Sequence, residues 1–422
     1  MSGEQSAVGE ERVEESNQDR IRGVARGLRL VPPAVTPLRT RDVVEGIVDH
    51  ARGTGRADFG RAVAAMLDAR AAATYSSYRR ALAACLRSIA EDRPERQSVL
   101  VPAFCSPDFP DAIEGVGLAV ERYDVDPRRL AADTDDLAAR LAHDTLAVVS
   151  VSPLGYASAM DDVAERCRDA DVPLVEAIGY AIGSSYEGRP IGAYGDYAVV
   201  NFQEGKPIPV GGGMVVDADG TGGFSDAGRP AASPNVVTLA GYAAAADPRV
   251  YGLYQRGATL LARFDLLGDR VTTHPGSKQV AAYDPPFATM SNFQCAVGRR
   301  VLDRLDANQR RRAATARYYR AELRDLPGID HLTAVSGLEN HQHVRYPLVA
   351  GSAELRDAVL DALDHVGVQA TPLYDSPTID PDRFPGAASL QGRLLTLPTH
   401  PYVDASDRRT VVETVRAVVA RR

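Results

Sequence analysis

Apolar side chains recur at helical spacing near the start of the chain, in the segments RDVVEGIVDHA and FGRAVAAMLDA. Apolar positions that return every three or four residues mark one face of an amphipathic helix. The pattern therefore predicts N-terminal helices over residues 36–70. The polar, glutamate-rich start of the chain lacks the basic and apolar parts of a signal peptide. We expect residues 1–35 to be a disordered tail on a cytoplasmic protein.

From about residue 71 the pattern alternates between short apolar runs and amphipathic stretches. SVLVPAF, LAVERYDV, LAVVSVS and VPLVEAI resemble strands, and DAIEGV, DDLAARLA and MDDVAERCRDA between them resemble helices. Such alternation is typical of βαβ units, in which helices cover both faces of a largely parallel sheet. Two further strands, DYAVVNF and GGMVVDA, follow. We assign residues 71–270 to a large α/β domain.

The last third of the chain predicts a smaller domain. Residues 236–268 favour helix with a break near Asp247, and residues 291–325 favour one long helix with an arginine-rich outer face. Strand-like VRYPLV, VQATPLY and RLLTLP then alternate with helical AELRDAVLDALDHV and ASDRRTVVETVRAVVA. We assign residues 271–422 to a linker and a small α+β domain.

Composition excludes several classes of protein. The chain has 422 residues, of which 45% are hydrophobic and 25% charged, as in a soluble protein of two or three domains. A net charge of −8 argues against general nucleic-acid binding. No apolar run is long enough to cross a bilayer. The four scattered cysteines suggest neither a disulfide framework nor a zinc site.

One short motif raises the question of a metal site. The HQH motif at residues 341–343 offers two imidazole ligands, but no third ligand is evident nearby. We therefore expect two solvated histidines at a strand edge and no metal.

Lysine is rare, and this rarity narrows the candidates for amine chemistry. The chain has only Lys206 and Lys278. Lys206 follows a predicted strand and precedes a run of three glycines, which allow tight turning and close approach to a ligand. A lysine at the carboxyl end of such a strand can reach the crevice where α/β sheets bind ligands. An ordinary loop lysine is the alternative, and Lys278 has the polar surroundings of a surface lysine.

A second candidate site lies in the segment TYSSYRRALAACL. Ser76 or Ser77 can cap the helix that follows, and a helix N-terminus offers free N–H groups to a phosphate. A plain N-cap without a ligand is the alternative.

Several segments, in the same order, resemble the DegT/DnrJ/EryC1/StrS family of aminotransferases. They include VVSVSPLGYASAMDDVAERC, GSSYEGRPIGAYGDYAVVNF with the lysine that follows, and LLTLPTHPYV. The resemblance implies the fold type I of pyridoxal-phosphate (PLP) enzymes, with a mostly parallel seven-stranded sheet and a small C-terminal domain. It also implies PLP as cofactor, a homodimer with sites at the subunit interface, and a keto-sugar nucleotide and an amino donor as substrates.

The family's site residues are only partly retained. Lys206 falls at the position of the Schiff-base lysine. Ser77 and Tyr78 fall where the family has Gly-Thr at the cofactor phosphate, next to Ser76, and Asn201 replaces a serine near that phosphate.

The aromatic ring that stacks on the cofactor in the family is replaced by Ser106. Phe104, Phe109 and Tyr156 are the candidates to take its place.

Ala177 is the largest departure, because it replaces the aspartate that keeps the pyridine nitrogen of PLP protonated in the family. Glu176 is adjacent, but neighbouring side chains on a strand point to opposite faces. Tyr180 and Ile182 replace a polar Gln and His of the same segment.

Three hypotheses follow. The chain is a PLP-dependent aminotransferase of glycan or secondary-metabolite synthesis, with Lys206 as Schiff base and proton shuttle. Alternatively, it is a PLP enzyme of altered reaction type, or a non-catalytic homologue that binds a sugar nucleotide or a partner subunit. Only the first hypothesis requires an amino donor that converts the cofactor to its pyridoxamine form.

Overall fold

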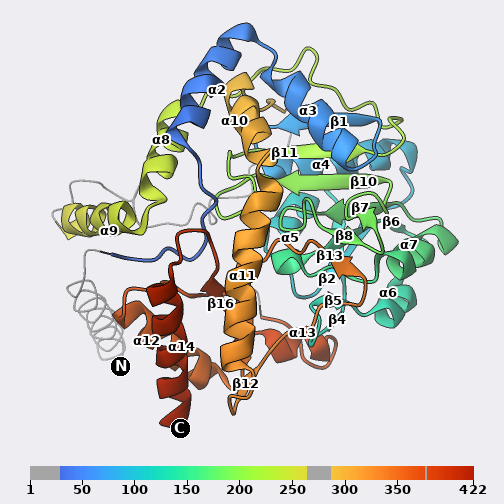
Figure 1. The fold of residues 1–422 in the computed structure, drawn as a ribbon. Helices are drawn as coiled ribbons and strands as arrows, with labels where there is room; N and C mark the ends of the chain where they lie inside the picture. Colours follow the sequence, from blue (N-terminus) through green and yellow to red (C-terminus); the bar gives the residue numbers. More distant parts are fainter. Residues whose placement is uncertain (1–28, 264–286, 376–377) are drawn as a thin grey trace, which may run out of the picture.

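The computed structural model describes residues 29–263, 287–375 and 378–422 (Figure 1). Residues 1–28 of the expected tail and Lys278 lie outside the described residues. None of the helices in the described ranges combines the length and apolarity needed to cross a membrane.

A seven-stranded sheet forms the centre of the large domain, as predicted. Its strand order is β1-β11-β10-β7-β6-β2-β3, in which β11 runs antiparallel to both neighbours and the remaining pairs are parallel. The strands are β1 (Ala71–Tyr75), β2 (Ser98–Pro102), β3 (Ala119–Tyr123), β6 (Thr145–Val151), β7 (Leu174–Ala177), β10 (Tyr197–Asn201) and β11 (Gly213–Asp217).

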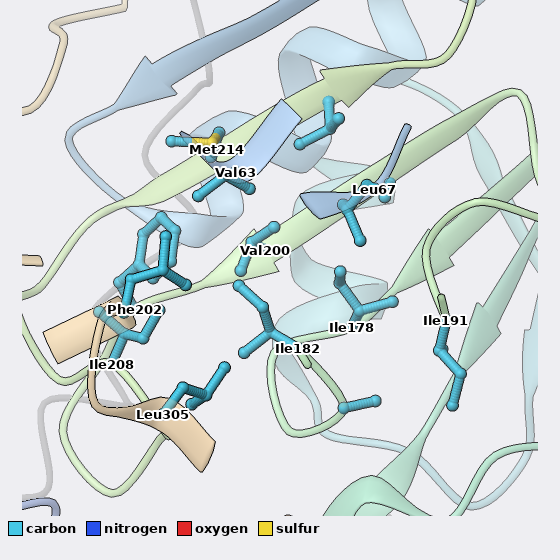
Figure 2. Packing of buried hydrophobic residues seen from close by; sticks show 14 of the residues in the cluster. Val63, Leu67, Ile178, Ile182, Ile191, Val200, Phe202, Ile208, Met214 and Leu305 are labelled. Atoms are coloured by element: carbon cyan, nitrogen blue, oxygen red, sulfur yellow. The ribbon is translucent and has the colours of Figure 1, made fainter. Parts of the chain in front are cut away.

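Helices cover both faces of this sheet, which explains why most side chains of its central strands are apolar. Val199 and Val215 face one core, while Val200, Met214 and Val216 face the other. Figure 2 shows the second core, where Val63 and Leu67 approach Val200 and Ile178. Burial of each such side chain contributes about 1.5–3 kcal/mol. The covering helices are α3 (Gly55–Met66), α4 (Tyr78–Asp92), α5 (Asp108–Glu114), α6 (Thr134–Arg140), α7 (Met160–Asp169) and α10 (Asn292–Leu302).

The long helix expected over residues 291–325 is wrong, because the structure divides it into α10 and α11 (Leu305–Leu323). The N–H of Arg304 bonds to the carbonyl of Val301 at 3.0 Å, one residue short of the α-helical partner, and this ends α10. The arginines on both sides are compatible with either arrangement, so the residue pattern gave no sign of the break.

The arginine run in α11 is only partly a solvated face. Arg310 and Arg311 are exposed as expected, but Arg312 points inward and is fully buried. Its guanidinium donates a hydrogen bond to the hydroxyl of Thr36. One face of α11 therefore carries a buried arginine, and the basic composition of the run did not indicate this burial.

The small domain is built on an antiparallel sheet of order β12-β14-β16-β15. Figure 1 shows α11 running from the large domain down to this domain, where it packs beside α14. The elements are β12 (Ile329–Asp330), β14 (Arg345–Ala350), α12 (Ala353–His365), β15 (Thr371–Pro372), α13 (Pro385–Leu390), β16 (Leu394–Pro398) and α14 (Ala405–Ala420).

The remaining elements complete the two domains. The expected break near Asp247 separates α8 from α9, which project from the body (Figure 1). The elements are α2 (Thr40–Arg52), β4 (Val125–Asp126), β5 (Ala131–Ala132), β8 (Ser185–Tyr186), β9 (Arg189–Pro190), α8 (Val236–Ala245), α9 (Pro248–Arg263), β13 (Leu338–Glu339) and the 3-10 turn Pro153–Gly155.

The end of the expected tail, residues 29–35, is ordered against the small domain. Val31 is 2% exposed and bridges to Val368, and Arg29 bonds through Nε to the carboxylate of Asp407 at 3.1 Å. The expectation of disorder is therefore wrong for these seven residues, since buried apolar side chains and an ion pair fix them.

Candidate active site

Most of the sequence-predicted site residues meet at one edge of the large sheet. The strand register pairs Tyr75 and Asn201 with the same residue, Gly213, and pairs Ala177 with Val199. The carboxyl ends of β1, β7 and β10 therefore lie at the same edge of the sheet, with β11 between β1 and β10. Ligands of open α/β sheets bind at this edge.

The loop that carries Lys206 is fastened on both sides. Phe202 and Ile208 are fully buried in the core drawn in Figure 2, and the N–H of Gly211 bonds to the carbonyl of Phe202 at 2.7 Å. The hydroxyl of Thr36 donates a hydrogen bond of 2.8 Å to the carbonyl of Lys206. These contacts fix the backbone from which the lysine side chain extends.

The amine of Lys206 lies on the ring of Tyr180, with 3.1 Å between Nζ and the ring centroid. The Tyr180 hydroxyl accepts a hydrogen bond of 2.7 Å from Arg345, which β14 brings from the small domain. Burial lowers the pKa of Lys206, against the opposing effect of Tyr180. Burial alone would raise the pKa of Tyr180, but the charges of Arg345 and Lys206 lower it to about 7.

Ser76, Ser77 and Tyr78 lie at the N-terminus of α4, beside the same edge. The Ser77 hydroxyl caps the helix by accepting from the N–H of Arg80 at 3.3 Å, and the Ser76 hydroxyl accepts from the Arg80 guanidinium at 2.9 Å. A Cβ on Gly213 would lie 2.7 Å from the Cα of Tyr78. Only a glycine in β11 therefore allows the helix terminus to come this close to the sheet.

Ser106 precedes α5, and its hydroxyl accepts from the N–H of Asp108 at 3.3 Å. Of the aromatic candidates, Phe109 is packed edge-to-face against Tyr78 at 5.6 Å between centroids, and Phe104 packs against Tyr374 at 5.3 Å.

The third aromatic candidate, Tyr156, is turned toward a different neighbour. Its ring packs against His341 at 4.6 Å between centroids.

Ala177 ends β7 with its side chain on the opposite face from Glu176. Ala177 is 5% exposed and belongs to the core beneath α4. The carboxylate of Glu176 is 1% exposed and accepts hydrogen bonds from the backbone of Gly192, Tyr194 and Gly195. The alternation of the strand is thus regular here, and Glu176 does not reach the edge that Ala177 faces.

The expectation of two solvated histidines is wrong, because His341 is buried and His343 is half-buried. His341 is 7% exposed, its ring lies 4.1 Å from that of His343, and its Nε2 bonds to the carbonyl of Leu154 at 2.9 Å. His400 is also buried, with Nε2 bonded to the carbonyl of Pro32 at 2.9 Å. Within the described ranges, no group of three or more His, Cys, Asp and Glu residues could hold a metal ion.

Three residues at this site were not predicted from the sequence: Thr36, Arg345 and Tyr374. Thr36 bonds to the carbonyl of Lys206, and Arg345 donates a hydrogen bond to the hydroxyl of Tyr180. The pKa of Tyr374 rises because of burial and the charge of Tyr180. All three are distant in sequence from Lys206 and carry no local motif. Only the fold brings them to this site.

Similarity to known proteins covers most of the chain. The sequence profile described as the DegT/DnrJ/EryC1/StrS aminotransferase family matches residues 40–222 and 286–416. The chain is 27% identical over 333 residues to dTDP-4-dehydro-2,3,6-trideoxy-D-glucose 4-aminotransferase of Saccharopolyspora spinosa, covering 76% of this chain and 78% of that one. It is 23% identical over 333 residues to GDP-perosamine synthase of Caulobacter vibrioides, covering 76% and 79%.

The fold has close counterparts among solved structures. The aminotransferase TlmJ from Streptoalloteichus hindustanus superposes with a TM-score of 0.71 at 23% identity, over 93% of this chain and 99% of that chain. At this identity the likeness establishes the architecture, a large mostly parallel sheet with a small C-terminal domain.

Proposed function

The chain belongs to the DegT/DnrJ/EryC1/StrS aminotransferase family, and on this premise we propose that it aminates a keto-sugar carried on a nucleotide, with PLP held at Lys206. One observation carries the proposal. The amine of Lys206 lies at the carboxyl edge of the sheet, and the N-terminus of α4 with its two serines lies at the same edge.

The residues present fit two of the three parts of PLP that a protein must hold. The Lys206 amine suits the aldehyde, and the N-terminus of α4 with Ser76 and Ser77 suits the phosphate. The close approach that Gly213 allows keeps this terminus at the sheet edge. For the ring nitrogen, β7 offers only the methyl group of Ala177, which can neither ionise nor donate a hydrogen bond.

When bound, PLP supplies an electron sink for the carbon that loses a proton. The chain supplies the group that moves this proton. Lys206 is placed for that work because burial favours its neutral amine, which is the form that accepts a proton. The ring of Tyr180 contacts the amine, and Arg345 from the small domain holds the Tyr180 hydroxyl.

A PLP enzyme of altered reaction type is the second candidate, and Ala177 is the observation that favours it. A ring nitrogen without a carboxylate partner is a weaker electron sink. Transamination depends strongly on that sink, while racemisation and some eliminations depend on it less. The choice between the two reactions therefore depends on whether an amino donor converts the cofactor.

The nucleotide sugar in the proposal comes from two relatives whose names specify a dTDP-sugar and a GDP-sugar. We further propose a homodimer. Exposed apolar side chains on α2 and α9 support it, since a second copy would cover them: Val44, Ile47, Val48, Val250, Leu253 and Tyr254. A cytoplasmic location stays a prediction.

The proposal is tested with full-length protein, PLP, an amino donor such as glutamate, and dTDP- or GDP-linked keto-sugars. Mass spectrometry should detect an amino-sugar nucleotide that depends on both the donor and PLP. Lys206→Ala should abolish the product, whereas Lys278→Ala should retain it. If the wild type binds PLP but no donor converts it, the altered reaction type replaces transamination. If no PLP binds, the non-catalytic hypothesis stands.

A further inference from the structure

Tyr180 contacts the reactive amine, and Arg345 from the other domain contacts Tyr180. Tyr180 stands on the turn after β7, and its ring face carries the Nζ of Lys206 at 3.1 Å. The Tyr180 hydroxyl also favours the charged form of Lys206, against the effect of burial on the pKa of the amine. Arg345, from β14 of the small domain, donates to the same hydroxyl at 2.7 Å. The tyrosine thus lies between two cations.

Arg345 is positioned to act on Tyr180 rather than on a carboxylate. Its other side-chain hydrogen bonds go to the hydroxyls of Thr371 and Thr396, at 2.8 and 3.4 Å, which carry no charge. A guanidinium is the cation that proteins keep protonated even inside the fold. Ionisation of the phenol would therefore place a negative charge next to a permanent positive one, which stabilises the phenolate.

Among the described residues, the other charged or titratable groups that act on this cluster include Asp108 from α5, Tyr374 beyond β15 and the buried thiol of Cys105. Asp108 favours the charged form of Lys206, and burial holds Tyr374 in its neutral form. Neither removes the effect of Arg345 on Tyr180, whose pKa falls to about 7. Every other described tyrosine with a shifted pKa moves upward, because burial is the largest influence on it and outweighs any nearby arginine: Tyr75, Tyr78, Tyr123, Tyr156, Tyr186, Tyr194, Tyr197, Tyr242, Tyr251, Tyr319, Tyr346, Tyr374 and Tyr402.

We propose that Tyr180 is the proton acceptor of Lys206, and that Arg345 is the positioning residue that gives it this role. The phenolate of Tyr180 takes one proton from the Lys206 ammonium, leaving a phenol and a neutral amine. Arg345 keeps its proton throughout, so the charge of the cluster does not change. The step rests on the proposed function, in which Lys206 must release a proton before it can attack a carbonyl or accept a proton from carbon.

The first test is an ultraviolet pH titration of the full-length protein without PLP. One of the 17 tyrosines should form tyrosinate near neutral pH. Tyr180→Phe should abolish this transition, Arg345→Gln should move it toward the ordinary range, and Arg345→Lys should restore part of it. A wild-type spectrum without a neutral transition, or one that persists in Tyr180→Phe, would overturn the proposal.

The second test follows Lys206 itself through its rate of labelling by an amine reagent at graded pH. Because the chain has two lysines, peptide mapping reads Lys206 and its internal control Lys278 in one experiment. The phenolate also stabilises the ammonium form of Lys206. In Tyr180→Phe only burial and Arg345 act on the pKa of the amine, so the labelling profile of Lys206 should move toward lower pH. An unchanged profile would overturn the proposal.

Both tests use no cofactor and no sugar. The proton-acceptor role can therefore fail while amino transfer is observed, and it can succeed while no amino transfer is observed. A Tyr180 that served only to fill space would leave both the tyrosinate transition and the Lys206 profile unexplained. The two experiments separate the inference from the proposed function.

Discussion

The carboxylate of Glu176 accepts a hydrogen bond of 2.8 Å from the backbone N–H of Gly192, on the face of β7 opposite to Ala177. The N–H groups of Tyr194 and Gly195 bond to its other oxygen at 2.6 and 2.7 Å. Burial nevertheless raises the pKa of Glu176 to about 7. The Glu176 carboxylate thus stabilises the turn before β10. Of the two neighbouring residues, only Ala177 faces the site.

Glu176→Gln should destabilise the fold without affecting the cofactor site. A glutamine amide has one acceptor oxygen, so at least one of the three buried N–H groups loses its partner, at a cost of about 1–3 kcal/mol. Chemical denaturation should show this loss, while PLP affinity stays within about twofold. The exposed Glu91→Gln serves as control and should leave both unchanged. Equal stability of Glu176→Gln and wild type would contradict the assigned role.

Ala177→Asp should strengthen the cofactor as an electron sink. A carboxylate at this position would pair with the pyridine nitrogen and keep it protonated. We expect the donor half-reaction, measured by stopped-flow absorbance, to accelerate by about tenfold or more, which corresponds to about 1.4 kcal/mol. Ala177→Asn has the same size and no charge, and it should not reproduce the gain. An acceleration in both variants would show that size rather than charge matters.

Gly213→Ala should disturb the N-terminus of α4. The added methyl would meet backbone atoms of Tyr78 and Ser77 at 2.7–3.1 Å, which cannot move aside like a flexible side chain. Overpacking of this kind costs about 1–3 kcal/mol. PLP affinity should fall with it, because the phosphate is assigned to this helix terminus.

Gly241→Ala is the matched control for that experiment. A methyl on Gly241, in α8, meets no atom within 4 Å. It should leave PLP affinity unchanged and keep or slightly raise stability, since alanine favours helix. Equal PLP affinity in Gly213→Ala and Gly241→Ala would remove α4 from the cofactor site.

The sheet was predictable because its strands carry their own signal. A strand covered on both faces is apolar throughout, so LAVVSVS and DYAVVNF could be placed from the residues alone. The division between α10 and α11 was not predictable, since it depends on one backbone hydrogen bond at Arg304. Buried His341 and Arg312 were also misjudged, because polar composition indicates exposure and gives no information about buried hydrogen-bond partners.

The residues of the candidate site also divide into those that the sequence predicted and those that it did not. Lys206 could be proposed from its place after a predicted strand and Ser77 from its place before a predicted helix, whereas Ala177 was proposed only from the resemblance to the family. Arg345 could not, because the small domain brings it to Tyr180 across 165 residues of chain. Contacts between distant segments depend on how the domains pack, and no local spacing encodes them.

Acid should destabilise the protein through its buried histidines. Burial lowers the pKa of His341 and of His400 to about 4, from an ordinary value of 6.5. Between these values the unfolded chain binds protons that the folded chain does not, so stability falls as pH decreases from 6.5 toward 4. The melting temperature should drop over this range. His341→Gln with His400→Gln should flatten the slope; an equally steep slope would contradict the assignment.

The most direct test of the account is where PLP attaches. The full-length protein is incubated with PLP, reduced with borohydride, digested and mapped by mass spectrometry, with Lys206→Ala in parallel. The account predicts a pyridoxyl group on the Lys206 peptide, none on the Lys278 peptide, and none in the variant. An unmodified Lys206, or equal modification of Lys206 and Lys278, would contradict it.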